Sequence, residues 1–306
     1  MQVFDRAAVR AHRERSAASW PQHDFLKREV AERLLDRLRD INRSFDVALD
    51  LGCHGGTVAQ LLPGIQKVDR LIQSDVAAAM ARQAAGTGWP ALVADEEALP
   101  FGPQSFDLAL SVLNLHWVND LPGTLLQLRH SLKPDGLFLG ALLGGESLHE
   151  LRVALMEAEL ELTGGLSPRI SPFAEVRDCG SLLQRAGFAL PVVDQDEITV
   201  TYGDPFGLLR DLRGMAETNA VQERPRGLSR RALFARMAEI YAQRFAQPDG
   251  RIPVTFQILY MTAWAPHEAQ QQPLRPGSAT TRLADALDTV ERAAGDKANP
   301  ARRPGA

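Results

Sequence analysis

Strand-like and helix-like runs alternate along the first half of the chain. Short apolar runs, typical of buried strands, occupy residues 46–52, 67–75, 91–95, 105–115 and 137–144. Runs with helical character lie between them at residues 56–64, 76–84 and 121–136. Strands that are apolar throughout are typical of parallel sheets covered on both faces by helices. The alternation therefore predicts an α/β fold built on a doubly wound, mainly parallel sheet.

Helical runs flank this predicted core on both sides. Upstream, one helix has an apolar face formed by Leu26, Val30, Leu34, Leu35 and Leu38. Downstream, strands at residues 192–202 and 254–264 are separated by a helical insert, which would lie above the carboxyl edge of the sheet, where ligands bind. We predict a helical cap (1–45), a core (46–145), the rest of the sheet (146–266) with a helical lid (about 203–250), and a polar tail (267–306) ending in disorder.

Composition and charge exclude several classes of protein. With 306 residues, 45% of them hydrophobic, the chain is long enough for one large core. Its net charge of −4 gives no basic field that would favour nucleic acid. Cys53 and Cys179 form neither a disulfide framework nor a metal-binding pair, which favours a reducing compartment such as the cytoplasm. No signal-peptide core and no membrane-spanning apolar run are found, so at most peripheral membrane contact is expected.

Acidic residues end three of the predicted strands. Asp50 precedes a glycine-rich turn, DLGCHGG, while Asp75 ends the second strand and Asp95 the third. In dinucleotide-binding folds, an acid about 20 residues beyond the glycine turn holds the ribose hydroxyls, and Asp75 fits that position. The full G-x-G-x-x-G fingerprint is absent because the glycines are spaced differently. An alternative is that Asp75 and Asp95 cap helices, since aspartate is a common cap.

This order of motifs resembles that of the class I S-adenosylmethionine-dependent methyltransferases over residues 45 to 145. The resemblance implies a Rossmann-like sheet of about seven strands and S-adenosyl-L-methionine as cofactor. Gly52 and Gly56 would let the backbone approach the methionine moiety, and Asp75 would hold the ribose. Asp95, with Glu96 beside it, would accept a hydrogen bond from the adenine amino group. The resemblance also places these residues near the cofactor: Asp50, Cys53, His54, Val76, Leu113 and Trp117.

A histidine, His54, occupies the position of the middle glycine in the turn. A Cβ there is costly only where the backbone needs a positive φ or a close contact, and histidine tolerates the left-handed region better than most residues. We expect the turn still to bind S-adenosylmethionine. The ring would point away from the sulfur, or cover the methionine tail near its carboxylate. In the alternative, His54 closes the site and the fold serves as a scaffold.

Three further features near the predicted site have two interpretations. His116 is a candidate general base because histidine titrates near neutrality, but it could equally be structural. Trp117 could be an ordinary core residue, since tryptophan is mostly used in packing. Glu146, His149 and Glu150 are spaced like half of a carboxylate metal site. No second Glu-x-x-His occurs in the chain, so no metal site is expected.

Longer stretches of the chain resemble the complex I assembly factor family. They run from Phe4 to about Thr280 and include FDR, LVADEEALPF, LHWVNDLP, LKPDG, SPRISPF, DLRGM and GSAT. The resemblance implies hydroxylation of an arginine in an iron–sulfur subunit of NADH dehydrogenase, in the mitochondrial matrix if the organism is a eukaryote. A weaker resemblance to the malonyl-carrier-protein methyltransferases of biotin synthesis implies methyl transfer to a small or carrier-bound acid.

Three functions therefore remain open: an assembly factor that modifies a respiratory-chain subunit, a true methyltransferase, and a scaffold that binds the cofactor only for structure. For either enzyme, Arg169, Arg210 and Arg213 are candidates to bind an anionic or peptide substrate. In the alternative interpretation these arginines only form the solvated face of a helix, because most arginines are exposed.

Overall fold

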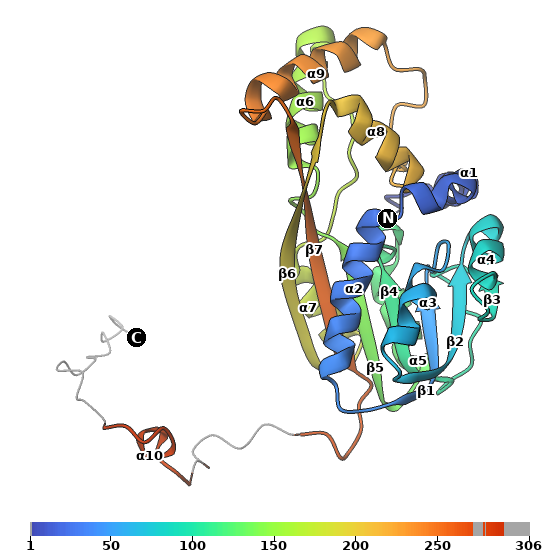
Figure 1. Cartoon of the computed structure of the whole chain (residues 1–306), viewed down its shortest axis with the longest axis vertical. Coiled ribbons are helices and arrows are strands. Elements are labelled where there is room, and N and C mark those ends of the chain that lie inside the picture. Colours follow the sequence, from blue (N-terminus) through green and yellow to red (C-terminus); the bar gives the residue numbers. More distant parts are fainter. Residues whose placement is uncertain (1, 272–277, 279, 291–306) are drawn as a thin grey trace, which may run out of the picture. The chain divides into compact units, whose positions relative to one another are not determined.

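The computed structural model describes residues 2–271, 278 and 280–290, and the chain divides into two units (Figure 1). The first unit, Met1–Glu268, contains the whole sheet. The second unit, Ala269–Ala306, has the short helix α10 (Leu283–Ala286) among its described residues. The predicted disorder of the last dozen residues lies outside the described part of the chain. Within that part, no helix is long and apolar enough to cross a membrane.

Seven strands form one sheet in the order β3-β2-β1-β4-β5-β7-β6. They are β1 (Phe45–Leu51), β2 (Val68–Asp75), β3 (Ala91–Val93), β4 (Phe106–Val112), β5 (Leu132–Leu143), β6 (Ala189–Tyr202) and β7 (Ile252–Trp264). Only β7 runs antiparallel to its neighbours β5 and β6. The strand order reverses between β1 and β4, and the crevice at such a switch point is where ligands bind in folds of this kind. The predicted doubly wound sheet of about seven strands is confirmed.

Helices cover both faces of the sheet because alternate residues of each strand point to opposite sides. Ala48 of β1 packs in the same core as α2 (Phe25–Asp40) and α3 (Thr57–Leu61), whereas Leu49 and Leu51 pack with α5 (Leu121–Ser131) and α7 (Val176–Arg185). The predicted apolar face of α2, from Leu26 to Leu38, is buried. Helix α4 (Ala78–Ala85) lies beside β2 and β3.

Two other groups of helices gather where the parallel strands end (Figure 1). One is the N-terminal pair α1 (Arg6–Ser16) and the 3-10 helix η1 (Ala17–Gln22). The other combines α6 (His149–Thr163) with the insert helices α8 (Pro205–Gly214) and α9 (Arg231–Phe245). Helix α8 begins at Asp204, whose carboxylate accepts from the Gly207 amide, and α6 packs on α9. Both groups therefore lie at the ligand-binding edge.

Local boundaries differ from the sequence-based prediction at two points, the end of the third strand and the end of α5. The third strand ends at Val93, before Asp95. The segment LKPDG belongs to β5 instead of closing α5, since the Ala265 amide donates to the carbonyl of Gly136 and ties the segment to the end of β7. Helix α9 begins after Arg230 without a side-chain cap, because the hydroxyl of Ser229 accepts from Arg169 instead.

Candidate active site

The glycine turn after β1 lies at the switch point of the sheet. Gly52 has a φ of 73° and Gly56 a φ of 83°, in the left-handed region that favours glycine. A Cβ on Gly52 would lie only 2.0 Å from the side chain of Asn114. The space beside Gly52 is thus taken by the Asn114 side chain.

His54 in this turn is held by its neighbours, and itself has a left-handed φ of 50°. Its buried ring stacks on Trp20 with 4.7 Å between ring centroids. The Nζ of Lys27 lies 2.6 Å from His54 Nδ1 and donates to the carbonyl of Gly52, also at 2.6 Å. Burial, followed by the charges of Lys27 and Arg13, lowers the pKa of His54 well below its ordinary value. The ring is therefore neutral, and its Nδ1 lies within hydrogen-bonding distance of both Lys27 Nζ and, at 2.9 Å, the Gly52 carbonyl.

Asp50 lies on β1, two residues before Gly52. It is fully buried, and among the described residues neither of its carboxylate oxygens has a hydrogen-bond partner. Burial raises its pKa to about 6, although the charge of Lys27 pulls the pKa down. An unpartnered buried carboxylate is rare, because leaving it without a hydrogen bond costs free energy. It is suited to receive a donor from a ligand.

The acids after β2 and β3 converge, and two arginines of α1 reach them. Asp75 is buried, and its Oδ2 lies 3.3 Å from Nη1 of Arg13. The same guanidinium lies 3.1 Å from Oε1 of Glu96, whose side chain is completely buried. Arg6 bonds the other oxygen of Glu96 and lies 2.7 Å from Asp95, which is 43% exposed. Burial would raise the pKa of Glu96, but Arg13 and Arg6 outweigh it and lower that pKa.

The remaining predicted cofactor residues lie close to these acids in the chain. Cys53, Val76 and Leu113 are all buried. Burial, together with the charges of Asp75 and Asp50, raises the pKa of the Cys53 thiol well above its ordinary value, so the sulfur stays protonated and is not a nucleophile.

His116 and Trp117 lie beside a larger pocket, and Trp117 forms part of its wall. Both side chains bond the carboxylate of Glu217, with 3.1 Å from His116 Nε2 and 3.1 Å from Trp117 Nε1 to its Oε2. The Trp117 ring also packs edge-on against Phe4 at 5.4 Å. His116 Nδ1 is buried and has no hydrogen-bond partner among the described residues. His116 and Trp117 thus hold the Glu217 carboxylate in place, and neither side chain faces solvent.

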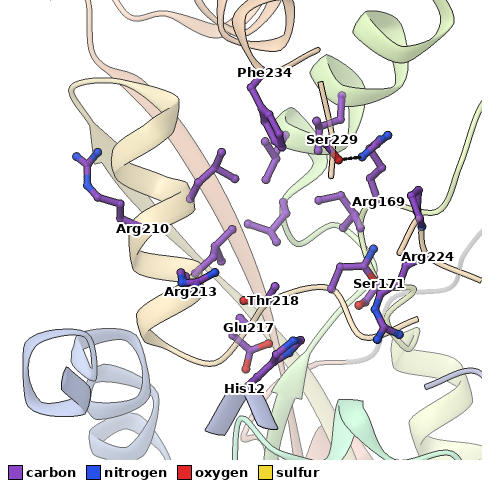
Figure 2. A pocket seen from close by; sticks show the side chains of 18 of the residues that line it. His12, Arg169, Ser171, Arg210, Arg213, Glu217, Thr218, Arg224, Ser229 and Phe234 are labelled. Atoms are coloured by element: carbon purple, nitrogen blue, oxygen red, sulfur yellow. Dashed lines mark hydrogen bonds between the residues drawn. The ribbon is translucent and has the colours of Figure 1, made fainter. Parts of the chain in front are cut away.

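This pocket has a volume of about 960 Å³ (Figure 2). Its floor and one side are apolar, with residues Leu151, Leu155, Leu209, Leu212 and Phe234. Polar side chains come from α1, α8 and the loops before α7 and α9. They are His12, whose pKa burial lowers to about 4, and the charged residues Arg15, Arg169, Arg210, Arg213, Glu217, Arg224 and Arg226. The pocket therefore suits a ligand with an apolar part and charged groups.

The three predicted substrate arginines all line this pocket, but they differ in their partners. Arg169 is held by Glu159, with 2.7 Å between Nη2 and Oε1, and bonds Ser229 at 2.9 Å (Figure 2). Arg213 and Arg210 are exposed on α8, and Arg210 points away from the other labelled side chains (Figure 2).

A further arginine, Arg15 on α1, lines the pocket together with Arg213. Burial, and then the positive charge of Arg213, lower the pKa of Arg15. Two like charges this close favour an anionic group between them.

Sequence reasoning missed five residues of the site: Arg6, Arg13, Lys27, Asn114 and Glu217. The basic segment FDRAAVRAHRERSAASW was visible, but nothing in its spacing indicates that Arg13 contacts a residue 62 positions away. Glu217 likewise lies 100 positions from Trp117. Such pairings depend on how separate elements pack, which local patterns do not encode.

The metal-like triplet lies apart from these acids. Glu146 precedes α6, while Glu150 in its first turn bonds the amide and hydroxyl of Thr255 at 3.1 and 2.6 Å. Within residues 2–271, 278 and 280–290, no group of three or more His, Cys, Asp or Glu side chains is arranged to hold a metal ion.

Comparison with known families and folds gives consistent results. Residues 49–140 match the methyltransferase domain family. The YcgJ protein of Bacillus subtilis superposes with a TM-score of 0.55 at 14% identity, over 78% of this chain and 98% of that one. At such identity the likeness shows the fold alone, which is that of the class I methyltransferases.

Relatives with close sequences extend over nearly the whole chain. The mitochondrial arginine-hydroxylase NDUFAF5 of Danio rerio is 44% identical over 289 residues, which cover 93% of this chain and 89% of the relative. The human protein of the same name is 44% identical over 93% of this chain and 83% of its own length. The malonyl-[acyl-carrier protein] O-methyltransferase of Halorhodospira halophila is 37% identical, over 86% of this chain and 89% of its own.

Proposed function

Since the chain belongs to the arginine-hydroxylase family of methyltransferase-fold enzymes, we propose that it binds S-adenosyl-L-methionine and hydroxylates an arginine side chain of a protein. The target we propose is an iron–sulfur subunit of NADH dehydrogenase. The observation that carries the proposal is the set of buried acids at the switch point, Asp50, Asp75 and Glu96, beside a pocket large enough for a peptide side chain. The 44% identity to arginine hydroxylases supports the choice of reaction.

Residues suited to each part of S-adenosyl-L-methionine surround the switch point. The free carboxylate of Asp50 suits the ammonium group of the methionine moiety, because a charge-assisted bond would satisfy a buried acceptor. Gly52 has no side chain of its own to hinder the methionine moiety, although the side chain of Asn114 lies against it. Asp75 and Asp95 would hold the ribose hydroxyls and the adenine amino group. When bound, this cofactor supplies an electrophilic methyl group on a sulfonium.

The pocket suits a peptide arginine. Among the described residues that line it, Glu217 is the one acid, and it lies where the pocket meets the cofactor side. A guanidinium would pair with this carboxylate, whose position His116 and Trp117 fix. Arg15 and Arg213 at the rim would then bind acidic residues that flank the arginine.

Hydroxylation replaces one C–H bond of the arginine side chain with C–O–H. With dioxygen as oxidant, two electrons and two protons from a reductant are consumed, and the second oxygen atom leaves as water. The chain's own contribution is to bind the guanidinium, to orient the side chain towards the cofactor, and to exclude water by its apolar lining.

A mass measurement on NADH dehydrogenase tests this function. In cells that lack the gene, one arginine-containing peptide of an iron–sulfur subunit should lose a mass of about 16 Da, one oxygen atom. The wild-type gene should restore it, and Glu217→Gln should not. An unchanged peptide mass in the deletion strain would contradict the proposal.

A second function, methyl transfer to a carrier-bound carboxylic acid, is favoured by the Arg15–Arg213 pair, which suits a carboxylate. The 37% identical carrier-protein methyltransferase agrees with it. Labelled S-adenosyl-L-methionine incubated with the protein and a cell lysate distinguishes the two. A label on a small molecule or a carrier protein would favour this function over hydroxylation.

A further inference from the structure

We infer that helix α1 competes with the cofactor for the cofactor site, so that α1 must leave before the site can be filled. The inference rests on the proposed function, because it takes Asp75, Asp95 and Glu96 as the acids that bind S-adenosyl-L-methionine. It adds a regulation of that site: the N-terminal segment acts as a plug that is displaced by the ligand.

The first observation concerns Asp75, whose two oxygens are both occupied. Its Oδ1 accepts from the amide of Ala77 at 2.9 Å, and its Oδ2 accepts from the amide of His54 at 3.0 Å. The guanidinium of Arg13 lies 3.3 Å from the same Oδ2. Arg13 itself is only 1% exposed, so its guanidinium is enclosed beside Asp75. Ribose hydroxyls could reach Asp75 only where Arg13 now lies.

The second observation concerns the acids after β3. Each oxygen of Glu96 contacts an arginine of α1, Oε1 with Arg13 and Oε2 with Arg6. Arg6 also lies 2.7 Å from Oδ1 of Asp95 and donates to the carbonyl of Trp117 at 3.2 Å. The positions expected for the adenine are therefore taken by the same helix that covers the ribose position.

The third observation concerns the glycine turn. Arg13 also bonds Oδ1 of Asn114, the side chain that lies against Gly52. Arg13 and Asn114 together cover the backbone that the methionine moiety would approach. One arginine thus connects all three parts of the cofactor site.

The other side of α1 forms part of the substrate pocket. His12 and Arg15 line that pocket, and Phe4 pairs with Val221 in the loop after α8. Asp5, which caps α1, bonds Arg224 at 3.0 Å. Displacement of α1 would therefore change both sites together. Because such coupling is reciprocal, a substrate that binds the displaced form would tighten cofactor binding.

Hydrogen–deuterium exchange on the wild-type full chain tests the inference directly. Addition of S-adenosyl-L-methionine or S-adenosylhomocysteine should make the amides of residues 6–16 exchange faster, while the amides around the glycine turn become protected. Protection of residues 6–16 by either ligand would overturn the inference, since α1 would then close over the ligand.

Calorimetry on a pair of matched variants gives the second test. Arg13→Gln removes the competing charge and should tighten binding of S-adenosyl-L-methionine by about tenfold or more. Arg10→Gln, on the exposed side of the same helix, should leave it unchanged. Should Arg13→Gln fold poorly, Arg6→Gln gives the same test at a more accessible side chain. If these variants bind the cofactor more weakly while the wild type still binds it, the inference is overturned and the proposed cofactor site stands. If neither wild type nor variant binds, the proposed cofactor site fails and the inference with it.

Discussion

At the scale of single residues, Asp50 is the group whose buried charge most clearly destabilises the folded state. Burial raises its pKa from 3.8 to about 6. The unfolded chain releases this proton near pH 4 while the folded chain keeps it, so the folded state loses stability as the pH rises from about 4 to 6. A shift of about two units corresponds to about 3 kcal/mol. We expect Asp50→Asn to raise the free energy of unfolding by up to about 3 kcal/mol at pH 8 and by nothing at pH 3, measured by urea denaturation. An equal gain at both pH values would contradict the electrostatic origin.

Asp75 and Asp95 differ in burial, and we expect them to differ in their contribution to binding. A buried carboxylate that bonds hydroxyls contributes roughly 1.5–3 kcal/mol per bond. Asp75→Asn should therefore weaken S-adenosyl-L-methionine binding by about tenfold to a hundredfold. Asp95→Asn should cost less, because its side chain is 43% exposed. Calorimetry on both variants measures these affinities. An unchanged affinity for Asp75→Asn would mean that Asp75 does not belong to the site. A larger loss for Asp95→Asn than for Asp75→Asn would exchange the roles of the two acids.

The backbone and the side chain of His54 have opposite effects on stability. Glycine would relieve the left-handed φ, which costs a non-glycine residue about 1 kcal/mol. It would also remove the ring that stacks on Trp20 and contacts Lys27. We expect His54→Gly to be less stable than the wild type in thermal unfolding, yet to bind S-adenosyl-L-methionine within about tenfold. If the wild type binds nothing while His54→Gly binds well, then the histidine closes the site.

At the scale of elements, the insert helix α8 brings exposed arginines to the pocket. Arg213 and Arg210 have no acidic partner within the described ion pairs, so their positive charge is available to a substrate. We expect the double variant Arg210→Ala, Arg213→Ala to lose at least about tenfold in kcat/KM, equivalent to about 1.4 kcal/mol. Its affinity for S-adenosyl-L-methionine should stay unchanged. Arg231→Ala, exposed in the same insert but outside the pocket lining, is the control. Loss of cofactor binding in the double variant would mean that these arginines hold the fold.

Elements whose limits depend on local pattern were predictable from the sequence. The apolar stripe of α2 appears where expected, since helical period is a local property. LKPDG was wrongly placed at the end of a helical run, because a tertiary partner, the strand β7, draws it into the sheet.

At the scale of the whole molecule, the doubly wound sheet follows from the alternation of strands and helices, but the site does not. The family resemblance named acids at strand ends, which topology brings to one edge. It could not reveal that Arg13 would lie between two of them, or that Glu217 would join two cavities. Those contacts join segments that are far apart in the sequence and that no repeat or spacing relates. They depend on how the elements pack in three dimensions.

The division of the chain into two units gives the last prediction. All seven strands, the acids and the pocket lie within Met1–Glu268. A chain that ends at Gln271 should therefore keep the core and its cofactor site. We expect its midpoint of thermal unfolding to stay within about 2 °C of the full chain, a change of no more than about 1 kcal/mol for a fold of this size. Its affinity for S-adenosyl-L-methionine should be unchanged in calorimetry. If the shortened chain binds the cofactor but no longer restores the arginine modification in a deletion strain, the removed residues act in recognition of the partner. If it loses cofactor binding, they form part of the site, and the separation into two units does not describe the working enzyme.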